Sequence, residues 1–220
     1  MSIYNCSLAA LTTITLGANT ESATTESGIN LQMDATNTDN TGIQIDCGIT
    51  ASSPSAITVG TDKGGFIEAT FFTTDWTKHD GVVIGFRKIE AFQTGFGGVV
   101  AAATGDPVYQ DVAVFGMMGT SDKLQTMTDL NNSGSATVTD TGNVAVDSQN
   151  LKLRVTVSST GAVTYLYEVN GLATSTNLSA PTSTVSYTFD DGDIIIPFVT
   201  IQNVNNNNAI YLKQLKICKI

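Results

Sequence analysis

The chain is 220 residues long, and its twenty acidic and ten basic side chains give a formal net charge of −10 with the single histidine neutral. Only 14% of the residues are charged, against about 25% in soluble globular domains, and Thr, Ser and Asn supply most of the polarity instead. This composition excludes a helical bundle or coiled coil, and the 41% hydrophobic content excludes an acidic disordered tail. Because no basic residue precedes Lys63, the chain also lacks the basic face of a nucleic-acid-binding protein.

One β domain with a single core accounts for a chain of this length. Residues 8–18 are fairly apolar, but no basic residue precedes them as a secretory signal requires, and no stretch reaches the length of a membrane-spanning helix. We therefore expect a protein made in the cytoplasm without a signal peptide. Cys6, Cys47 and Cys218 are an odd, widely spaced set, which we expect to be reduced thiols packed as small hydrophobic residues; one disulfide at most is the alternative.

Alternation of apolar and polar residues with a period of two predicts strands along most of the chain. The predicted strands cover 29–33, 43–47, 66–72, 82–86, 98–103, 108–116, 151–157, 162–169, 185–189, 194–201 and 209–220. One short helix is expected at 88–93, and the long polar segments, including 130–148, are expected to be loops. About a dozen strands with almost no helix predict an all-β fold, either a two-sheet sandwich or a closed barrel.

Three local signals refine this prediction. The strands 151–157 and 162–169 flank a Ser-Ser-Thr-Gly turn, and Asn170-Gly171 follows them as a strong turn signal, so they form an antiparallel hairpin. The apolar period slips by one residue between Leu212 and Leu215, which predicts a β-bulge. Pro197 inside an apolar run indicates a strand edge or a bulge at that point.

From Leu151 onward, the order of motifs resembles the second half of concanavalin A-like (laminin G-type) jelly-roll sandwiches. The motifs are an LRVTV strand, a Ser/Thr-Gly turn, a YLYEV strand, the Asn170-Gly171 turn, an FDDGD loop, and the strands IIIPFVTI and AIYLKQLKI, together with the earlier GFIEATFF. The resemblance implies an antiparallel jelly-roll sandwich of about a dozen strands. The Thr-, Asn- and Gly-rich texture is also similar to that of virion structural proteins of tailed bacteriophages, which use jelly rolls as capsid decoration proteins or fibre tips.

The sequence contains few residues in patterns suited to catalysis. Jelly-roll relatives include glycoside hydrolases, which need a pair of carboxyl groups across the scissile bond, but no Glu here has an Asp two positions later. Glu68 and Glu168 fall on predicted strands, where a lone Glu usually faces solvent. His79 is near Asp75 and Asp80 in what reads as a polar loop, so we expect a surface histidine. We predict that the protein is not an enzyme.

Two features could serve ligand binding. Asp190, Asp191 and Asp193 cluster on a Gly-containing loop, and residues 34–40 form a second oxygen-rich loop; both could hold calcium, although Asp and Asn are also ordinary turn formers. Trp76, in the polar loop, could stack on a sugar ring, whereas the aromatic run 66–72 is expected in the core. The predicted ligand contacts are therefore Trp76 and these three aspartates, and no cofactor or metal is assigned.

Charge is distributed unevenly along the chain. Residues 1–62 carry no basic side chain, whereas Lys213, Lys216 and Lys219 lie in a C-terminal segment without acidic ones. These lysines either protect an edge strand or form a subunit contact with an acidic neighbour. We expect residues 1–62 to form strands or an arm that packs on the sandwich of 63–220 or crosses onto a neighbour.

These observations favour a non-enzymatic virion structural protein, most directly a capsid decoration (cement) protein that forms a homotrimer and contacts a major capsid protein. The alternative is a carbohydrate-binding, lectin-like module or a receptor-binding fibre tip that uses Trp76 and the aspartate loop. A glycan hydrolase with an unfamiliar carboxylate pair is the third hypothesis. No nucleic-acid or membrane partner is expected.

Overall fold

The computed structural model describes residues 13–16, 20–25, 28–33, 42–48, 50–90, 109, 111–119, 121–130, 136–171, 176–203 and 209–220; the first three ranges and residue 203 are described by their backbone only. Within these ranges the chain forms fourteen strands and one 3-10 turn, η1 (Trp76–Lys78). The strands are β1 (Thr13–Leu16), β2 (Thr20–Thr25), β3 (Gly28–Met33), β4 (Gly42–Asp46), β5 (Ile57–Thr58), β6 (Gly64–Thr73), β7 (His79–Lys88), β8 (Val112–Met118), β9 (Lys123–Asp129), β10 (Thr137–Val144), β11 (Asn150–Ser158), β12 (Val163–Val169), β13 (Ile194–Asn203) and β14 (Ala209–Lys219).

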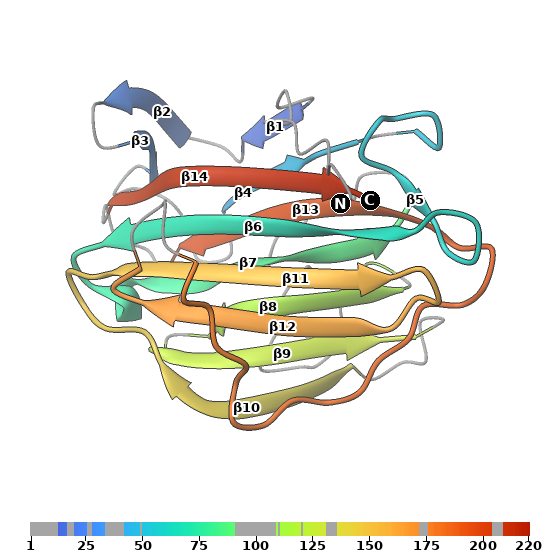
Figure 1. The fold of residues 1–220 in the computed structure, drawn as a ribbon. Coiled ribbons are helices and arrows are strands. Elements are labelled where there is room, and N and C mark those ends of the chain that lie inside the picture. Colours follow the sequence, from blue (N-terminus) through green and yellow to red (C-terminus); the bar gives the residue numbers. More distant parts are fainter. Residues whose placement is uncertain are drawn as a thin grey trace.

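The strands form two stacked antiparallel sheets (Figure 1). The eight-stranded sheet has the order β1-β4-β13-β7-β8-β9-β10, with β5 paired to β13, and the six-stranded sheet has the order β12-β11-β6-β14-β3-β2. Strands that are distant in sequence are neighbours in both sheets, as β4 and β13 are in one and β6 and β14 in the other. The predicted all-β, antiparallel jelly-roll sandwich of about a dozen strands is confirmed.

The core fills the space between the two sheets. On β11 the alternate residues Leu151, Leu153, Val155 and Val157 are all buried, as the sequence period predicts, and they pack in one cluster with residues of β7 such as Ile84. Burying a side chain of this kind contributes about 1.5–3 kcal/mol relative to exposure. Because inner-facing residues are fixed by this core, alternate residues on the same strands must face outward, where the candidate sites lie.

The hairpin, the bulge and the proline behave as the sequence predicts. Gly161, with φ of 83°, closes the turn between β11 and β12. The register of β14 against β6 shifts between Leu212 and Gln214, which leaves Lys213 as the extra residue of the bulge. Along one edge of β13, the pairing with β5 ends at Ile195 and the pairing with β4 begins at Phe198. Pro197, which has no N–H to donate, lies in the gap between these two pairings.

Other predictions were wrong or incomplete. The short helix expected at 88–93 is absent from its described part, because β7 continues to Lys88 and residues 88–90 contain no helix. The strand predicted at 185–189 is a single bridge between Ala162 and Thr188. β10 lies inside a predicted loop, because its Thr-rich sequence is mostly exposed and has no apolar alternation. The predicted strand at 98–103 and Cys6 fall outside the described residues.

Residues 1–62 contribute strands to both sheets. β1 pairs only with β4 and β2 only with β3, so these strands lie at the ends of the two sheets. A separate arm boundary at residue 62, and a crossing onto a neighbouring subunit, stay predictions.

Candidate functional site

Trp76 is fully buried, so the prediction that it stands exposed in a polar loop is wrong. The Asp75 side chain caps η1 by accepting from the Thr77 N–H at 3.0 Å, and this turn directs the indole into the core. The Trp76 Nε1–H donates to the carbonyl of Val146 at 3.0 Å, and its backbone N–H donates to Asp147 at 2.9 Å. With both groups satisfied inside the protein, the ring offers no face to a sugar.

The aspartate loop is an internally bonded turn. Asp193 is buried and pairs with Lys88 Nζ at 2.6 Å, and its second oxygen accepts from the Asp190 N–H at 3.2 Å. Lys88 Nζ also lies 3.3 Å from Asp111, and the hydrogen bond that Lys88 donates to Asp193 raises the pKa of the lysine. Asp190 and Asp191 are exposed. No group of three acidic, histidine or cysteine residues in the described ranges is arranged to hold a metal ion, and residues 34–40 lie outside those ranges.

The structure does not bring Trp76 and the aspartate loop together. Trp76 lies just before β7 begins at His79. Lys88, which forms the ion pair with Asp193, is the last residue of β7. Ten residues at about 3.3 Å each separate these two points by roughly 30 Å. The predicted joint ligand site is therefore not formed.

The three C-terminal lysines lie on β14, which pairs with β6 along most of its length but with β3 only over residues 209–212. Within the described residues, the stretch that carries the lysines therefore has a neighbouring strand on one side only, as the edge-strand interpretation expects. Lys219 belongs to the end of the strand, where Nζ pairs with Asp62 at 2.9 Å and donates to the carbonyl of Ala56 at 2.7 Å. Lys213 and Lys216 instead contact aromatic rings. This difference separates Lys219 from the other two.

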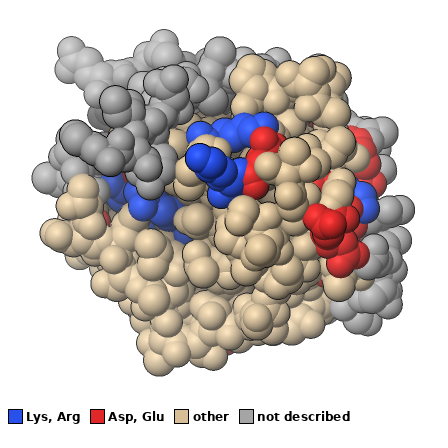
Figure 2. Space-filling model, turned by 45° about the vertical axis from the view of Figure 1, so that its right-hand side comes forward, with Lys and Arg blue, Asp and Glu red and all other residues tan. Residues whose placement is uncertain are grey.

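A basic–aromatic patch, made of Phe66, Phe72, Arg154, Lys213 and Lys216, lies on the outer face of the six-stranded sheet. Lys213 Nζ is 4.6 Å from the centroid of the Phe72 ring, and Arg154 Cζ and Lys216 Nζ are 4.5 and 5.5 Å from that of Phe66. Both phenylalanines are half-buried rather than in the core. Figure 2 views the molecule obliquely and shows Lys and Arg side chains across the middle and left, with acidic side chains directly beside the central group and a second acidic group at the right.

A buried ion cluster lies beneath the patch and includes one of its residues, Arg154. Glu68 pairs through Oε1 with Lys152 Nζ at 3.2 Å and through Oε2 with Arg154, whose Nε lies 2.7 Å away. The side chains of Glu68 and Lys152 are 3% and 2% exposed, whereas that of Arg154 is 29% exposed. Both carboxylate oxygens thus hold cations, and Arg154 is the member of the cluster that reaches its solvent side.

Polar atoms with unmet hydrogen-bonding capacity lie between the two phenylalanines. Thr70 follows Glu68 on the outward face of β6, and Gln214 is its partner in register on β14. In the described part of the chain, the Thr70 hydroxyl and the Gln214 side-chain oxygen are buried and have no hydrogen-bond partner. Such groups cost about 1–3 kcal/mol each, and because Thr70 is fully buried they lie beneath the surface of the patch rather than on it.

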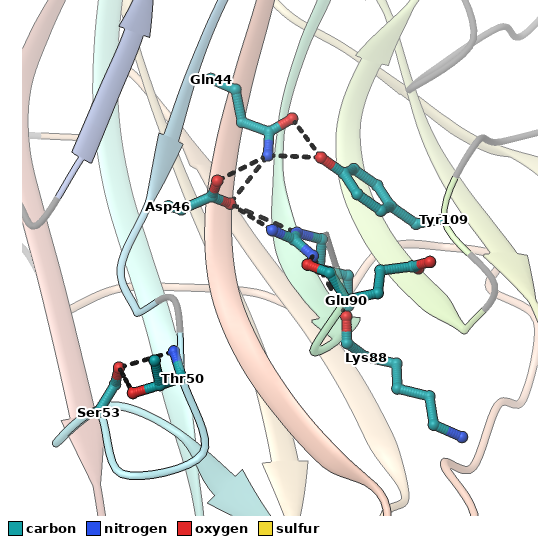
Figure 3. Close-up of polar contacts among 8 residues, drawn as sticks. Gln44, Asp46, Thr50, Ser53, Lys88, Glu90 and Tyr109 are labelled. Carbon is teal, nitrogen blue, oxygen red and sulfur yellow. Dashed lines mark hydrogen bonds and ion pairs between the residues drawn. The ribbon is translucent and has the colours of Figure 1, made fainter. Parts of the chain in front are cut away.

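A second polar cluster lies on the outer face of the eight-stranded sheet (Figure 3). Gln44 Nε2 donates to both oxygens of Asp46, at 2.8 and 3.0 Å, and lies 2.8 Å from the hydroxyl of Tyr109. Arg87 donates to Asp46 at 3.1 Å, and its guanidinium carbon stacks 4.1 Å from the Tyr109 ring centroid. The remaining guanidinium donors of Arg87 reach the carbonyls of Lys88 and Glu90.

This second cluster is closed to solvent. Asp46 and Arg87 are 3% and 2% exposed, Gln44 and Tyr109 are fully buried, and a second apolar cluster that includes Val114 and Phe198 borders them. The sequence analysis missed it, although Gln44 and Asp46 interrupt an apolar strand at alternate positions, which places both side chains on the outward face. Every charge in the cluster has a partner, so it stabilises the sheet.

His79 is also buried, contrary to the expected surface histidine. It begins β7, its Nε2 lies 3.2 Å from the Thr73 hydroxyl, and burial lowers its pKa to about 4. Cys47 and Cys218 are free and buried, as the sequence predicts for small hydrophobic residues. Burial next to Asp46 raises the pKa of the Cys47 thiol to about 12, which keeps it protonated.

In the ranges that the structure describes, no helix has the length and hydrophobicity needed to cross a membrane.

Comparison with known proteins identifies a fold. No model of a protein family and no curated protein sequence matches the chain. Among solved structures, peanut lectin in complex with a nine-residue peptide matches with a TM-score of 0.56 at 12% identity, over 94% of this chain and 91% of the lectin. A protein of unknown function from Shewanella oneidensis matches with 0.55 at 12% identity, over 97% and 81%.

The exoplasmic/lumenal domain of VIP36, bound to calcium and Man3GlcNAc, matches with a TM-score of 0.54 at 9% identity, over 91% of this chain and 81% of that domain. None of these three structures is described as a phage protein, so they give the virion hypothesis no support. At such low identity the likeness concerns the fold alone. The chain has the concanavalin A-like jelly-roll sandwich fold that the sequence motifs resemble.

Proposed function

We propose that the protein is a non-enzymatic, lectin-like carbohydrate-binding module whose ligand lies on the basic–aromatic patch. The observation that carries this proposal is the presence of two half-buried rings, Phe66 and Phe72, on one outward sheet face beside the cations of the patch. Rings of this kind contact the apolar faces of sugars, and the cations can donate hydrogen bonds to sugar oxygens. Proteins with the same fold, VIP36 among them, are carbohydrate binders by their descriptions.

The spacing of the rings favours an oligosaccharide over a single sugar. Phe66 and Phe72 both face outward on β6 and stand six residues apart, which is about 20 Å at 3.3 Å per residue. A ligand that touches both rings must follow the strand across Thr70. Because β6 is flanked by β11 and β14 and pairs with both, with one bulge at Lys213, its backbone is held in place and little ordering free energy is lost on binding.

The test is affinity electrophoresis against a panel of neutral and acidic polysaccharides. We expect the wild-type chain to be retarded by at least one of them and the Phe66→Ala/Phe72→Ala variant to bind it at least tenfold more weakly. Leu130→Ala, which removes an exposed apolar side chain outside the patch, is the matched control and should bind as the wild type does. Wild-type mobility unchanged by every polysaccharide would contradict the proposal.

A second candidate is the virion decoration protein, with a homotrimer as its assembly. The uneven charge favours it, because Lys213 and Lys216 project from a chain with a net charge of −10 and could meet an acidic surface of another subunit. Light scattering tests this candidate. A trimer that dissociates in the Lys213→Glu/Lys216→Glu variant supports it, whereas a wild-type monomer that binds a glycan supports the first proposal.

A further inference from the structure

We infer that the ligand of the basic–aromatic patch is an anionic glycan, one that carries carboxylate or sulfate groups along its length. This inference rests on the proposed glycan-binding function and adds the chemical class of the sugar. It follows from the way in which the cations of the patch differ from the other cations of the molecule.

Most basic side chains in this acidic chain are neutralised by carboxylates. Arg87, Lys88, Lys123, Lys152 and Lys219 each form at least one ion pair. Lys213 and Lys216 form none within the described part of the chain, and each lies over a phenylalanine ring instead. With twice as many acidic as basic residues available, two lysines without an ion pair on one sheet face mark a surface suited to an anion from outside. Lys63, just before β6, is exposed and likewise has no ion pair among the described groups, but it lies over neither ring of the patch.

Arg154 adds a third donor to this surface. Its Nε and Nη2 are taken by Glu68, but no described group accepts a hydrogen bond from Nη1, and the side chain is 29% exposed. Register places Arg154, Glu68 and Lys216 side by side on β11, β6 and β14. A carboxylate or sulfate above Glu68 would therefore meet a guanidinium on one side and an ammonium on the other, with Lys213 beside Phe72 further along β6.

The aromatic rings hold these cations in place. A cation over a ring is attracted by the quadrupole of the ring, by about 0.5–1 kcal/mol at an exposed site, so the lysine chains lose less freedom when a ligand binds. A neutral sugar would have to compete with the ammonium groups for the ring faces. An anionic sugar instead gains ion pairs with the same cations as it approaches the rings, which is why the geometry favours charge on the ligand.

The test compares polygalacturonate with fully methyl-esterified polygalacturonate, which has the same backbone without the charge, by affinity electrophoresis and by titration calorimetry. We expect the wild-type chain to bind the acid form at least tenfold more tightly than the ester, and the Lys213→Ala/Lys216→Ala variant to lose at least tenfold in affinity for the acid form. The control is Lys78→Ala/Lys123→Ala, which makes the same change in net charge through two exposed lysines outside the patch and should bind as the wild type does.

Each other outcome has a distinct meaning. Equal binding of acid and ester, or binding of neutral polysaccharides only, with loss in the Phe66→Ala/Phe72→Ala variant, overturns the anionic inference and leaves the glycan-binding function standing. Binding of poly-glutamate as tightly as polygalacturonate overturns the inference in favour of an acidic protein partner. No binding of any polysaccharide, acidic or neutral, overturns the proposed function itself.

Discussion

On the outer face of the eight-stranded sheet, Asp46 and Arg87 are almost fully buried and each satisfies the other, whereas on the outer face of the six-stranded sheet Glu68 is shared by two cations, one of which reaches solvent. Both clusters arise in the same way, from charged residues at outward positions of apolar strands. They differ in exposure, because the first is closed to solvent and the second reaches solvent through Arg154. A partly exposed cation next to half-buried rings is available to a ligand, whereas a closed cluster is not.

Replacing Arg87 tests the closed cluster most severely. In Arg87→Ala, Asp46 stays buried without its ion-pair partner, and breaking a buried ion pair in this way costs about 3–5 kcal/mol. Urea unfolding should show a loss of that size, and Lys123→Ala, which removes an exposed ion pair with Asp140, should show little change. A loss below about 1 kcal/mol for Arg87→Ala would mean that the cluster is open to water, which keeps each charge solvated.

The Trp76→Ala variant distinguishes a loss of stability from a loss of glycan affinity. Because the indole of Trp76 is fully buried and bonded to Val146, Trp76→Ala should lower the free energy of unfolding by about 3–5 kcal/mol. Glycan affinity of the folded variant should match the wild type. Phe72→Ala should do the opposite, with a smaller loss of stability and a larger loss of affinity. If Trp76→Ala abolished binding in a variant shown to be folded, the original assignment of Trp76 as a sugar contact would be restored.

His79 makes stability depend on pH. Burial lowers its pKa from 6.5 to about 4 in the folded state, so the unfolded chain binds the proton first as the pH falls. The stabilisation from this residue is complete above pH 6.5 and is lost between pH 6.5 and 4, by about 3 kcal/mol in total. Urea unfolding at pH 7 and pH 4 should give a smaller pH-dependent change for His79→Gln than for the wild type. Equal changes in the two proteins would show that His79 is solvated.

The labelling rate of the Cys47 thiol tests whether the interior excludes solvent, and it is the prediction with the smallest expected effect on the protein. The thiol, with a pKa of about 12, is neutral at pH 8 and shielded by the core. Labelling with iodoacetamide, followed by peptide mass spectrometry, should be at least a hundredfold slower in the native chain than in urea. Rapid native labelling at Cys47 would indicate that the end of β4 opens readily.

The fold was largely predictable from the sequence, because period-two alternation fixes which side of a strand faces the core. Strands without that alternation were missed: β10 is Thr-rich and exposed, and β5 has only two residues. The bulge at Lys213 and the position of Pro197 were predicted, since both disturb a regular pattern in the sequence itself.

The candidate site was harder to predict because it depends on which strands become neighbours. Glu68, Arg154 and Lys216 come from three strands, and nothing local in the sequence brings them into one row. Lys213 and Lys216 were identified from the uneven charge and expected on an edge strand, but the aromatic rings that they contact belong to β6 and could not be assigned to them from the sequence. Trp76 and His79 were placed on the surface because their polar flanks, which include Asp75 and Asp80, concealed that the chain turns both rings inward.

The most direct test of glycan binding at the basic–aromatic patch is lysine footprinting. The chain is acetylated with and without the polysaccharide that it binds most tightly, and modification at each lysine is measured by mass spectrometry. The account predicts that the ligand protects Lys213 and Lys216 and leaves Lys78 and Lys123 as reactive as before. Unchanged reactivity of Lys213 and Lys216 in the saturated complex would contradict it and move the binding surface elsewhere on the sandwich.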